Sequence, residues 1–70
     1  MAGLKWSDAD EIGCQLNERF PAVDPLKVRF TELRQKVLEL EAFDDEPAAS
    51  SEPALEAIQM AWLEYRRQGN

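Results

Sequence analysis

Residues 50–69, SSEPALEAIQMAWLEYRRQG, contain one apolar stripe at helical spacing, formed by Leu55, Ile58, Trp62 and Tyr65. Ser50 or Ser51 is a suitable N-cap, because Pro53 then falls in the first helical turn and Glu52 lies at the positive end of the helix dipole. Arg66 and Arg67 fall in the last turn, where cations are favoured, and Gly69 can end the helix. The stretch predicts a helix with one buried face.

Two shorter helices are predicted upstream of this one. The first runs from Asp8 to Arg19, with Ser7 as its cap and Asp10 in the reciprocal place of a capping box, and its stripe is Ala9, Ile12, Leu16 and Phe20. The second begins after Thr31, which is a plausible N-cap, and carries the stripe Leu33, Val37 and Leu40. Leu38 lies well off that stripe, which predicts a contact on a second side of this helix.

The segments between the helices read as turns and loops. Residues 21–30 contain two prolines and then a short alternating piece in which Val28 and Phe30 share one side, so an extended element is expected there. Residues 41–51 are polar and acidic, and we expect an exposed loop anchored by Phe43. Trp6 precedes a helix cap and is expected to staple the entry chain onto the bundle. The expected fold is mainly α: one domain over residues 1–70, with three helices, a core over 4–65, at most a very short β element and a short basic tail at 66–70.

The composition limits what such a domain can do. The chain has 70 residues, with 14 acidic and eight basic side chains, a formal charge of −6, no histidine and one cysteine. A negative field repels phosphate groups, so neither nucleic acid nor an anionic membrane is an expected partner. Without histidine a nucleophilic triad cannot be assembled, and no enzyme is expected. The single cysteine and the lack of an apolar N-terminal run favour a cytoplasmic protein, which we expect to be monomeric.

Carboxylates gather on one face of the first predicted helix and in the loop. Asp8, Asp10, Glu11 and Glu18 lie away from the Ile12/Leu16 stripe, and Asp44, Asp45 and Glu46 follow one another in the loop. A solvated polar face is the simplest interpretation. The alternative is a weak, open site for a hard cation such as magnesium, calcium, manganese or iron, which would relieve the repulsion between like charges. Cys14 falls near Asp10 and Glu18 and is expected to be an inert, exposed thiol.

Several motifs bear on the family. The pieces GLKWSD (3–8), EIG (11–13), VDPLKVRFTEL (23–33), FDDEPAASSE (43–52) and LEAIQMAWLE (55–64) occur in order over nearly the whole chain. Together they resemble the IscX (YfhJ) family, small acidic accessory proteins of bacterial iron-sulfur cluster assembly. The resemblance implies a modified winged-helix fold, docking on the basic surface of the cysteine desulfurase IscS, weak binding of ferrous or ferric iron through surface carboxylates, and tuning of desulfurase activity. It also implies ferredoxin as a further partner and competition with frataxin.

Site residues follow from matching the acids to these motifs. The expected metal ligands are Asp8, Glu11, Glu18, Asp44, Asp45 and Glu46, and the expected partner contacts are Asp8, Glu11, Asp24, Glu32, Glu39, Asp44 and Asp45. Glu18 and Glu39 lie outside the tightest motifs, and Cys14 and the basic tail from Tyr65 to Asn70 depart from the family pattern.

Two other functions stay open at this point. The first is an acidic protein-protein adaptor whose metal binding is incidental. The second, DNA binding, follows from fold analogy alone; Lys27, Arg29, Arg34 and Lys36 offer it a small basic patch, but the net charge opposes it.

Overall fold

The computed structural model of the chain describes residues 3–69, which form three α-helices and two short 3-10 helices. In chain order these are α1 (Ala9–Arg19), η1 (Pro25–Lys27), α2 (Phe30–Leu38), η2 (Pro47–Ala49) and α3 (Glu52–Gly69). Within residues 3–69 the β structure is a single isolated bridge between Leu4 and Phe43, so the expected mainly α fold is confirmed. No helix in this part of the chain has the length and apolarity needed to span a membrane.

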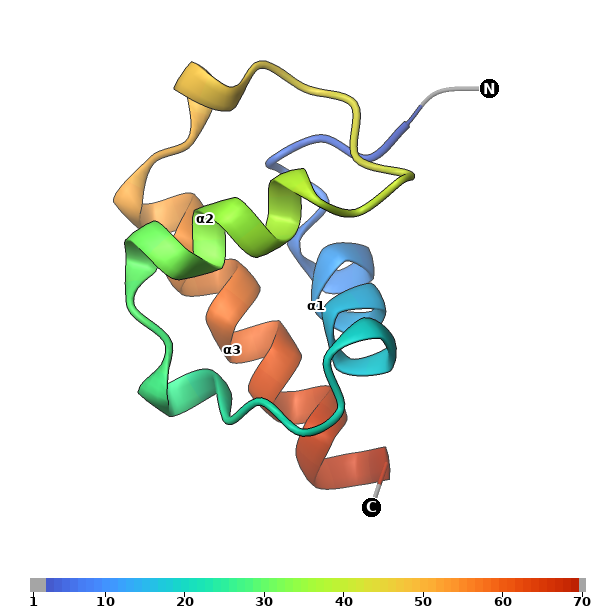
Figure 1. Cartoon of the computed structure of the whole chain (residues 1–70). Helices are drawn as coiled ribbons and strands as arrows, with labels where there is room; N and C mark the ends of the chain where they lie inside the picture. The colour runs from blue at the N-terminus through green and yellow to red at the C-terminus, as the bar shows by residue number, and fades with distance from the viewer. Residues whose placement is uncertain (1–2, 70) are drawn as a thin grey trace.

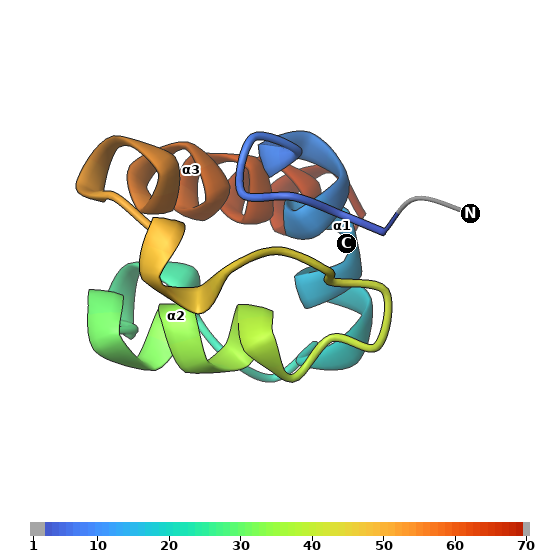
Figure 2. The same cartoon turned by 90° about the horizontal axis from the view of Figure 1, so that it is seen from above.

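The long helix α3 is the platform on which the rest of the chain packs. It runs behind α2 and beside α1 in Figure 1, and the view from above in Figure 2 separates α2 from the layer that contains α3. The three predicted stripes meet in one core, whose buried members are Trp6, Ile12, Leu16, Leu33, Val37, Leu40, Leu55, Ile58 and Trp62. Phe20, predicted in a stripe, is only half-buried where it packs against this core, and Tyr65 is half-buried as well. Leu38 is also half-buried against the core, as its place off the stripe predicted.

The helix starts differ from the prediction at two of three positions. Asp8, not Ser7, is the N-cap residue of α1, and its Oδ2 accepts a hydrogen bond from the Lys5 N–H at 2.8 Å. Helix α2 begins at Phe30, before the expected cap Thr31, because Glu32 Oε1 accepts from the Arg29 N–H at 3.1 Å and so satisfies a donor at the helix start. The extended piece expected over Val28 and Phe30 is therefore wrong at Phe30. The cap of α3 is confirmed at Ser51, whose Oγ accepts from the Ala54 N–H at 3.3 Å.

The loop after α2 is fastened to the N-terminal segment. We call residues 42–47 the acidic strap. Leu4 donates its N–H to the Ala42 carbonyl and accepts at its own carbonyl from the Asp44 N–H, both at 2.8 Å. The Trp6 indole N–H donates to the Glu46 carbonyl at 2.7 Å. The Trp6 ring packs edge-on against Phe43, with ring centroids 4.7 Å apart. The predicted anchoring by Phe43 and stapling by Trp6 are confirmed, and they act on each other.

The C-terminal basic residues belong to α3. The helix continues to Gly69, and Arg66 Nη1 donates to the carbonyls of Pro21, at 3.3 Å, and Val23, at 2.7 Å. This part of the predicted tail therefore holds the turn after α1 against the end of α3. Asn70 lies outside the described residues.

Candidate functional site: an acidic groove

The acidic side chains divide into two groups by what their oxygens contact. Within residues 3–69, the carboxylates that accept hydrogen bonds from the chain are those of Asp8, Asp24, Glu32, Asp45 and Glu64. Four of these five were predicted site residues. Asp8 and Glu32 accept from the backbone near the starts of α1 and α2, and Asp24 accepts from the Leu26 N–H in η1 at 3.0 Å. These carboxylates therefore stabilise the local backbone by hydrogen bonding, a role that their motifs alone did not indicate.

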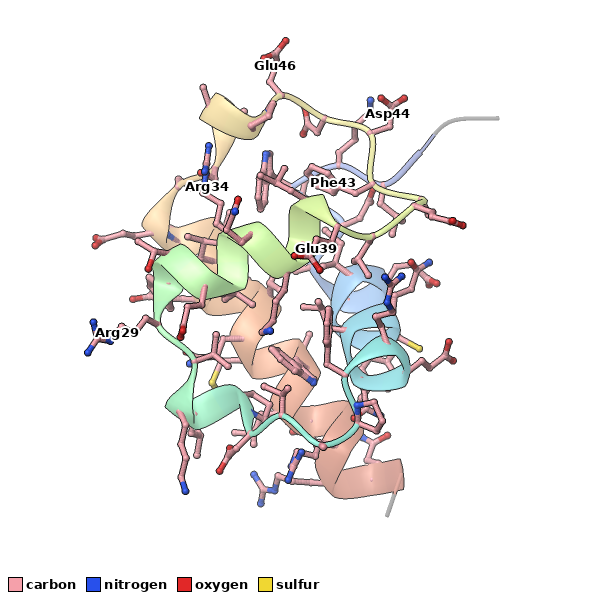
Figure 3. The ribbon with its side chains drawn as sticks, viewed as in Figure 1. Arg29, Arg34, Glu39, Phe43, Asp44 and Glu46 are labelled. Atoms are coloured by element: carbon pink, nitrogen blue, oxygen red, sulfur yellow. The ribbon has the colours of Figure 1, made fainter. Side chains whose placement is uncertain are left out.

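Asp45 is the most strongly engaged acid of the predicted site. Its Oδ2 accepts from the Trp6 N–H at 3.0 Å and its Oδ1 from the Glu46 N–H at 2.7 Å. The hydrogen bond from Trp6, then the one from Glu46, lower the pKa of this carboxyl, and the nearby charge of Lys5 adds to the effect. Asp45 thus holds the acidic strap to the N-terminal segment that precedes α1. Its neighbours Asp44 and Glu46 are exposed, and both side chains project outward from the strap in Figure 3.

The unengaged acids of α1 line an open groove between this helix and the segment that follows α2. The groove encloses about 470 Å³ and is lined by Glu11, Cys14, Gln15, Glu18, Arg19, Leu40, Glu41 and Ala42. Glu11 and Glu18 lie seven residues apart on α1, or roughly 10.5 Å along the helix axis. Glu41 enters from the other wall. The structure therefore brings together two predicted site residues and one that the sequence interpretation missed.

Glu41 could not be found from a pattern within one element. It stands in the same acidic loop as the predicted ligands, but it precedes their motif. Its relation to Glu11 depends on the turn after α2, where the N–H groups of Glu39 and Leu40 donate back to carbonyls of α2 and bring the chain toward α1. The signal available in the sequence was only the sign of its charge.

The groove holds its cysteine in the neutral form. Cys14 is half-buried, not exposed as expected, and desolvation raises the pKa of its thiol; the charges of Glu18, Glu11 and Asp10 raise it further. Both causes disfavour the thiolate that nucleophilic and metal-binding cysteines need, and they support the prediction of an inert thiol. The pKa of Tyr65, on the adjoining face of α3, is raised first by Asp10 and then by desolvation.

Other predicted residues lie outside the groove. Glu32 and Glu39 line a separate, open hollow on α2 together with Lys36, and Asp24 lies at η1. Among residues 3–69, no three cysteine or carboxylate side chains gather closely enough to hold a metal ion between them. The six expected metal ligands are thus distributed between α1 and the strap, and a closed coordination shell is not formed there.

The basic patch considered for DNA binding is divided by the fold. Arg34 donates to the Pro47 carbonyl, at 3.0 Å from Nη2, and its Nε lies 3.1 Å from Ser50 Oγ. Lys36 Nζ lies 4.5 Å from the centre of the Phe20 ring. Two of its four cations are therefore engaged within the chain, which leaves only Lys27 and Arg29 of the patch.

Comparisons with known proteins identify the family. Residues 4–67 match the family described as iron-sulphur cluster assembly. An uncharacterized protein of Pseudomonas aeruginosa is 54% identical over 63 residues, which make up 90% of this chain and 96% of that protein. The matched region contains α1, α2, the acidic groove and all but the last two residues of α3, and it agrees with the IscX-type resemblance of the motifs. The chain therefore belongs to the iron-sulphur cluster assembly family.

Proposed function

We propose that this protein is an accessory and regulatory subunit of iron-sulfur cluster assembly that docks on a basic surface of a cysteine desulfurase. The observation that carries the proposal is the acidic groove, where Glu11, Glu18 and Glu41 are exposed and accept none of the side-chain hydrogen bonds found within residues 3–69. Carboxylates without an internal partner are available to cations of another protein. The role is an accessory one, with the chemistry carried out by the desulfurase.

The arrangement suits electrostatic docking. Asp44 and Glu46 extend the negative surface onto the strap, and the strap is held firmly by Trp6 and Asp45. A preorganised acidic surface loses little side-chain and loop freedom on binding, and complementary charge raises the rate of association. Docking of this kind weakens as salt rises, because surface charges are screened over about 10 Å at 0.1 M.

Iron is proposed as a weakly held cargo of the same surface. Glu11 and Glu18 are too far apart along α1 for both to reach one ion without rearrangement, and the residues described here form no three-ligand group. Any one ion then has one or two protein oxygens and completes its shell with water, as hard cations do. An occupied carboxylate is lost to the desulfurase, so iron loading competes with docking.

Docking is tested by reversing charges in the groove. Glu11→Lys and Glu41→Lys should each weaken desulfurase binding roughly threefold to tenfold at low salt, since each replaces an attraction by a repulsion. Glu56→Lys, on the exposed side of α3, changes the net charge equally and is the matched control. Equal losses in all three variants would show a general charge effect, and no loss at Glu41 would exclude the groove as the contact.

The iron part has its own test. In an anaerobic ferrous titration followed by NMR, amides around Glu11, Glu18 and Glu41 and around Asp44 and Glu46 should broaden before the rest. Residues 3–69 contain no three-ligand group, and this favours the second candidate, an adaptor with only incidental metal binding. Equal affinity for calcium, magnesium and ferrous iron would support that candidate, whereas a preference for iron would support the regulatory role.

A further inference from the structure

The acidic groove has an apolar base beneath its charged mouth. Leu40 is only 5% exposed and Cys14 is half-buried, whereas the three glutamates that line the groove are exposed. The lining atoms of Leu40 and Cys14 therefore lie deepest, and the carboxylates lie nearer to solvent. An occupant of the groove meets sulfur and hydrocarbon below and negative charge above.

The charges are also ordered along the groove. On the α1 wall, Cys14 follows Glu11 by about one helical turn and precedes Glu18 by about one more, with 5.4 Å between turns. Arg19, the one cation among the eight lining residues, comes directly after Glu18 in the last turn of α1. The helix dipole adds only about half a charge at each end, which is less than the full charge of Arg19. A second cation is therefore opposed near Glu18 and favoured near Glu11.

The middle of the α1 wall carries no charge. Burial raises the pKa of the Cys14 thiol, and the nearby carboxylates, Glu18 first, raise it further, so the thiol stays protonated at neutral pH. A protonated cysteine behaves as a small hydrophobic group. Ala42 adds a methyl group on the facing wall. The stretch between the two acidic ends of α1 can therefore contact hydrocarbon.

Hydrogen bonds hold the facing wall in place. The Leu40 N–H donates to the Val37 carbonyl, and the Phe43 N–H donates to the Leu40 carbonyl, both at 3.1 Å. The Ala42 carbonyl accepts from the Leu4 N–H at 2.8 Å. Since the other wall is a helix, both sides of the groove are formed before a partner arrives, and little freedom is lost on binding.

We propose, building on the function above, that the acidic groove binds one long basic side chain of the docking partner, a lysine or an arginine. Its methylene stem lies along Cys14 and Leu40, and its cationic head lies at the Glu11 end. Lysine and arginine lay their stems on apolar surface while their charged heads stay in water, which matches an apolar base with exposed carboxylates. The volume of about 470 Å³ falls within the roughly 300–1,000 Å³ of ligand sites, so one whole side chain can enter.

Charge and depth together select this occupant. An acidic or phosphate-bearing group is repelled, because the lining sets three carboxylates against one guanidinium. A hydrated metal ion is attracted but makes no use of the apolar base, and residues 3–69 contain no three-ligand group to hold it. A purely apolar side chain fits the base but would bury charged carboxylates without a partner, which is costly.

The first test adds three small probes to the full chain and follows amide NMR at constant ionic strength. N-acetyl-arginine amide has both stem and head, the guanidinium ion has the head alone, and N-acetyl-norleucine amide has the stem alone. We expect the arginine derivative to shift Cys14 and Ala42, the guanidinium ion to bind about threefold more weakly or worse, and the norleucine derivative not to bind. Glu11→Gln should weaken the arginine derivative about threefold, Glu18→Gln should weaken it less, and Arg19→Gln should strengthen it.

The second test fills the groove without changing its charge. Ala42→Leu should weaken binding of both the arginine derivative and the desulfurase about fivefold or more, because the larger side chain occupies the place of the stem. Ala42 contributes its backbone carbonyl to the fold and its side chain is exposed, so the variant should keep the native amide spectrum. Ala57→Leu makes the same change on an exposed face of α3 and should leave both affinities unchanged.

Two outcomes overturn the proposal. Equal binding of the guanidinium ion and the arginine derivative would show that the stem makes no contact. Unchanged desulfurase affinity in Ala42→Leu, together with a loss in Glu41→Lys, would show docking by surface charge alone, so the proposed function would stand without the bound side chain. Conversely, binding of the arginine derivative that Ala42→Leu abolishes, with no loss of desulfurase affinity in Glu41→Lys, would support the basic-side-chain site and overturn the desulfurase as its partner.

Discussion

At Gly13 the helices α1 and α3 approach so closely that there is no room for a side chain larger than hydrogen. A Cβ built there would lie 2.7 Å from Ala61 Cβ, 2.7 Å from the Trp62 nitrogen and 2.8 Å from the Ala61 carbonyl carbon. Two of these three atoms belong to the backbone, so no side-chain rotation can relieve the contact. The glycine in the EIG motif is therefore a packing residue.

Gly13→Ala should lower the free energy of unfolding by about 1–3 kcal/mol, because overpacking outweighs the roughly 1 kcal/mol by which alanine favours a helix. Urea denaturation measures the loss. Ala57→Gly, on an exposed face of α3, calibrates the helix propensity alone. A stabilised Gly13→Ala variant would show that the two helices do not touch here; adding Ala61→Gly should recover only part of the loss, because the backbone contacts remain.

Asp45 gives the fold a dependence on acid. Hydrogen bonds from Trp6 and Glu46 lower its pKa in the folded state, so the charged carboxylate stabilises the native chain above the pKa of the unfolded state. This contribution is lost as the pH falls below about 4 and passes through the lowered folded value. We expect Asp45→Asn to reduce stability at neutral pH and to flatten the loss between neutral and acidic pH. Thermal unfolding across that range, with Asp44→Asn as the exposed neighbour control, measures both. Equal acid profiles for the two variants would contradict the role assigned to Asp45.

At the scale of elements, the acidic strap depends on Trp6 in a way that the other tryptophan does not share. The Trp6 indole N–H donates to the Glu46 carbonyl, whereas the Trp62 indole N–H has no hydrogen-bond partner among the described residues although Trp62 is fully buried. Trp6 therefore holds one loop by both a hydrogen bond to Glu46 and ring packing on Phe43. Trp62 is an apolar centre of the whole core.

Trp6→Phe should remove about 1–2 kcal/mol through the lost hydrogen bond and the reduced packing on Phe43, and the effect should be local. Amide exchange of Asp44, whose N–H donates to the Leu4 carbonyl, is expected to accelerate more than that of residues within α1 and α3. Trp62→Phe should instead lower global stability and accelerate exchange in all three helices, because it leaves a cavity in the core. The same exchange pattern in both variants would contradict the distinction.

The sequence predicted the helices well and their connections less well. Helical stripes depend on residues three and four apart, and the predicted first helix differs from α1 by one residue at its start. The expected extended piece is present at Val28 and wrong only at Phe30, where the hydrogen bond from the Arg29 N–H to Glu32 helps to start α2. The strap contacts join residues about 40 positions apart, such as Trp6 with Glu46, and no local pattern encodes such a pair.

At the scale of the whole molecule, the charge count was a sounder guide than the assignment of single acids. Fourteen acids predicted a negative surface, but hydrogen bonding separates structural Asp8 and Asp45 from available Glu11 and Glu18. Glu41 joins the available set only because the turn after α2 brings it to the groove. Which acids can serve a partner is therefore a property of the tertiary structure.

A net charge of −6 in 70 residues implies that repulsion between like charges lowers the stability of the folded chain. Raising NaCl from about 20 to about 200 mM should increase Tm by about 2–4 °C, equivalent to roughly 0.5 kcal/mol for a domain of this size. Glu41→Gln should reduce this response more than Glu56→Gln, since Glu41 faces Glu11 and Glu18 across the groove and Glu56 stands apart from them.

Calcium or magnesium chloride at the same ionic strength should raise Tm further if groove carboxylates bind cations directly, because a ligand that prefers the folded state stabilises it. Identical curves for the monovalent and divalent salts would confine the effect to screening, and would remove the physical basis for a metal-responsive groove while leaving electrostatic docking intact.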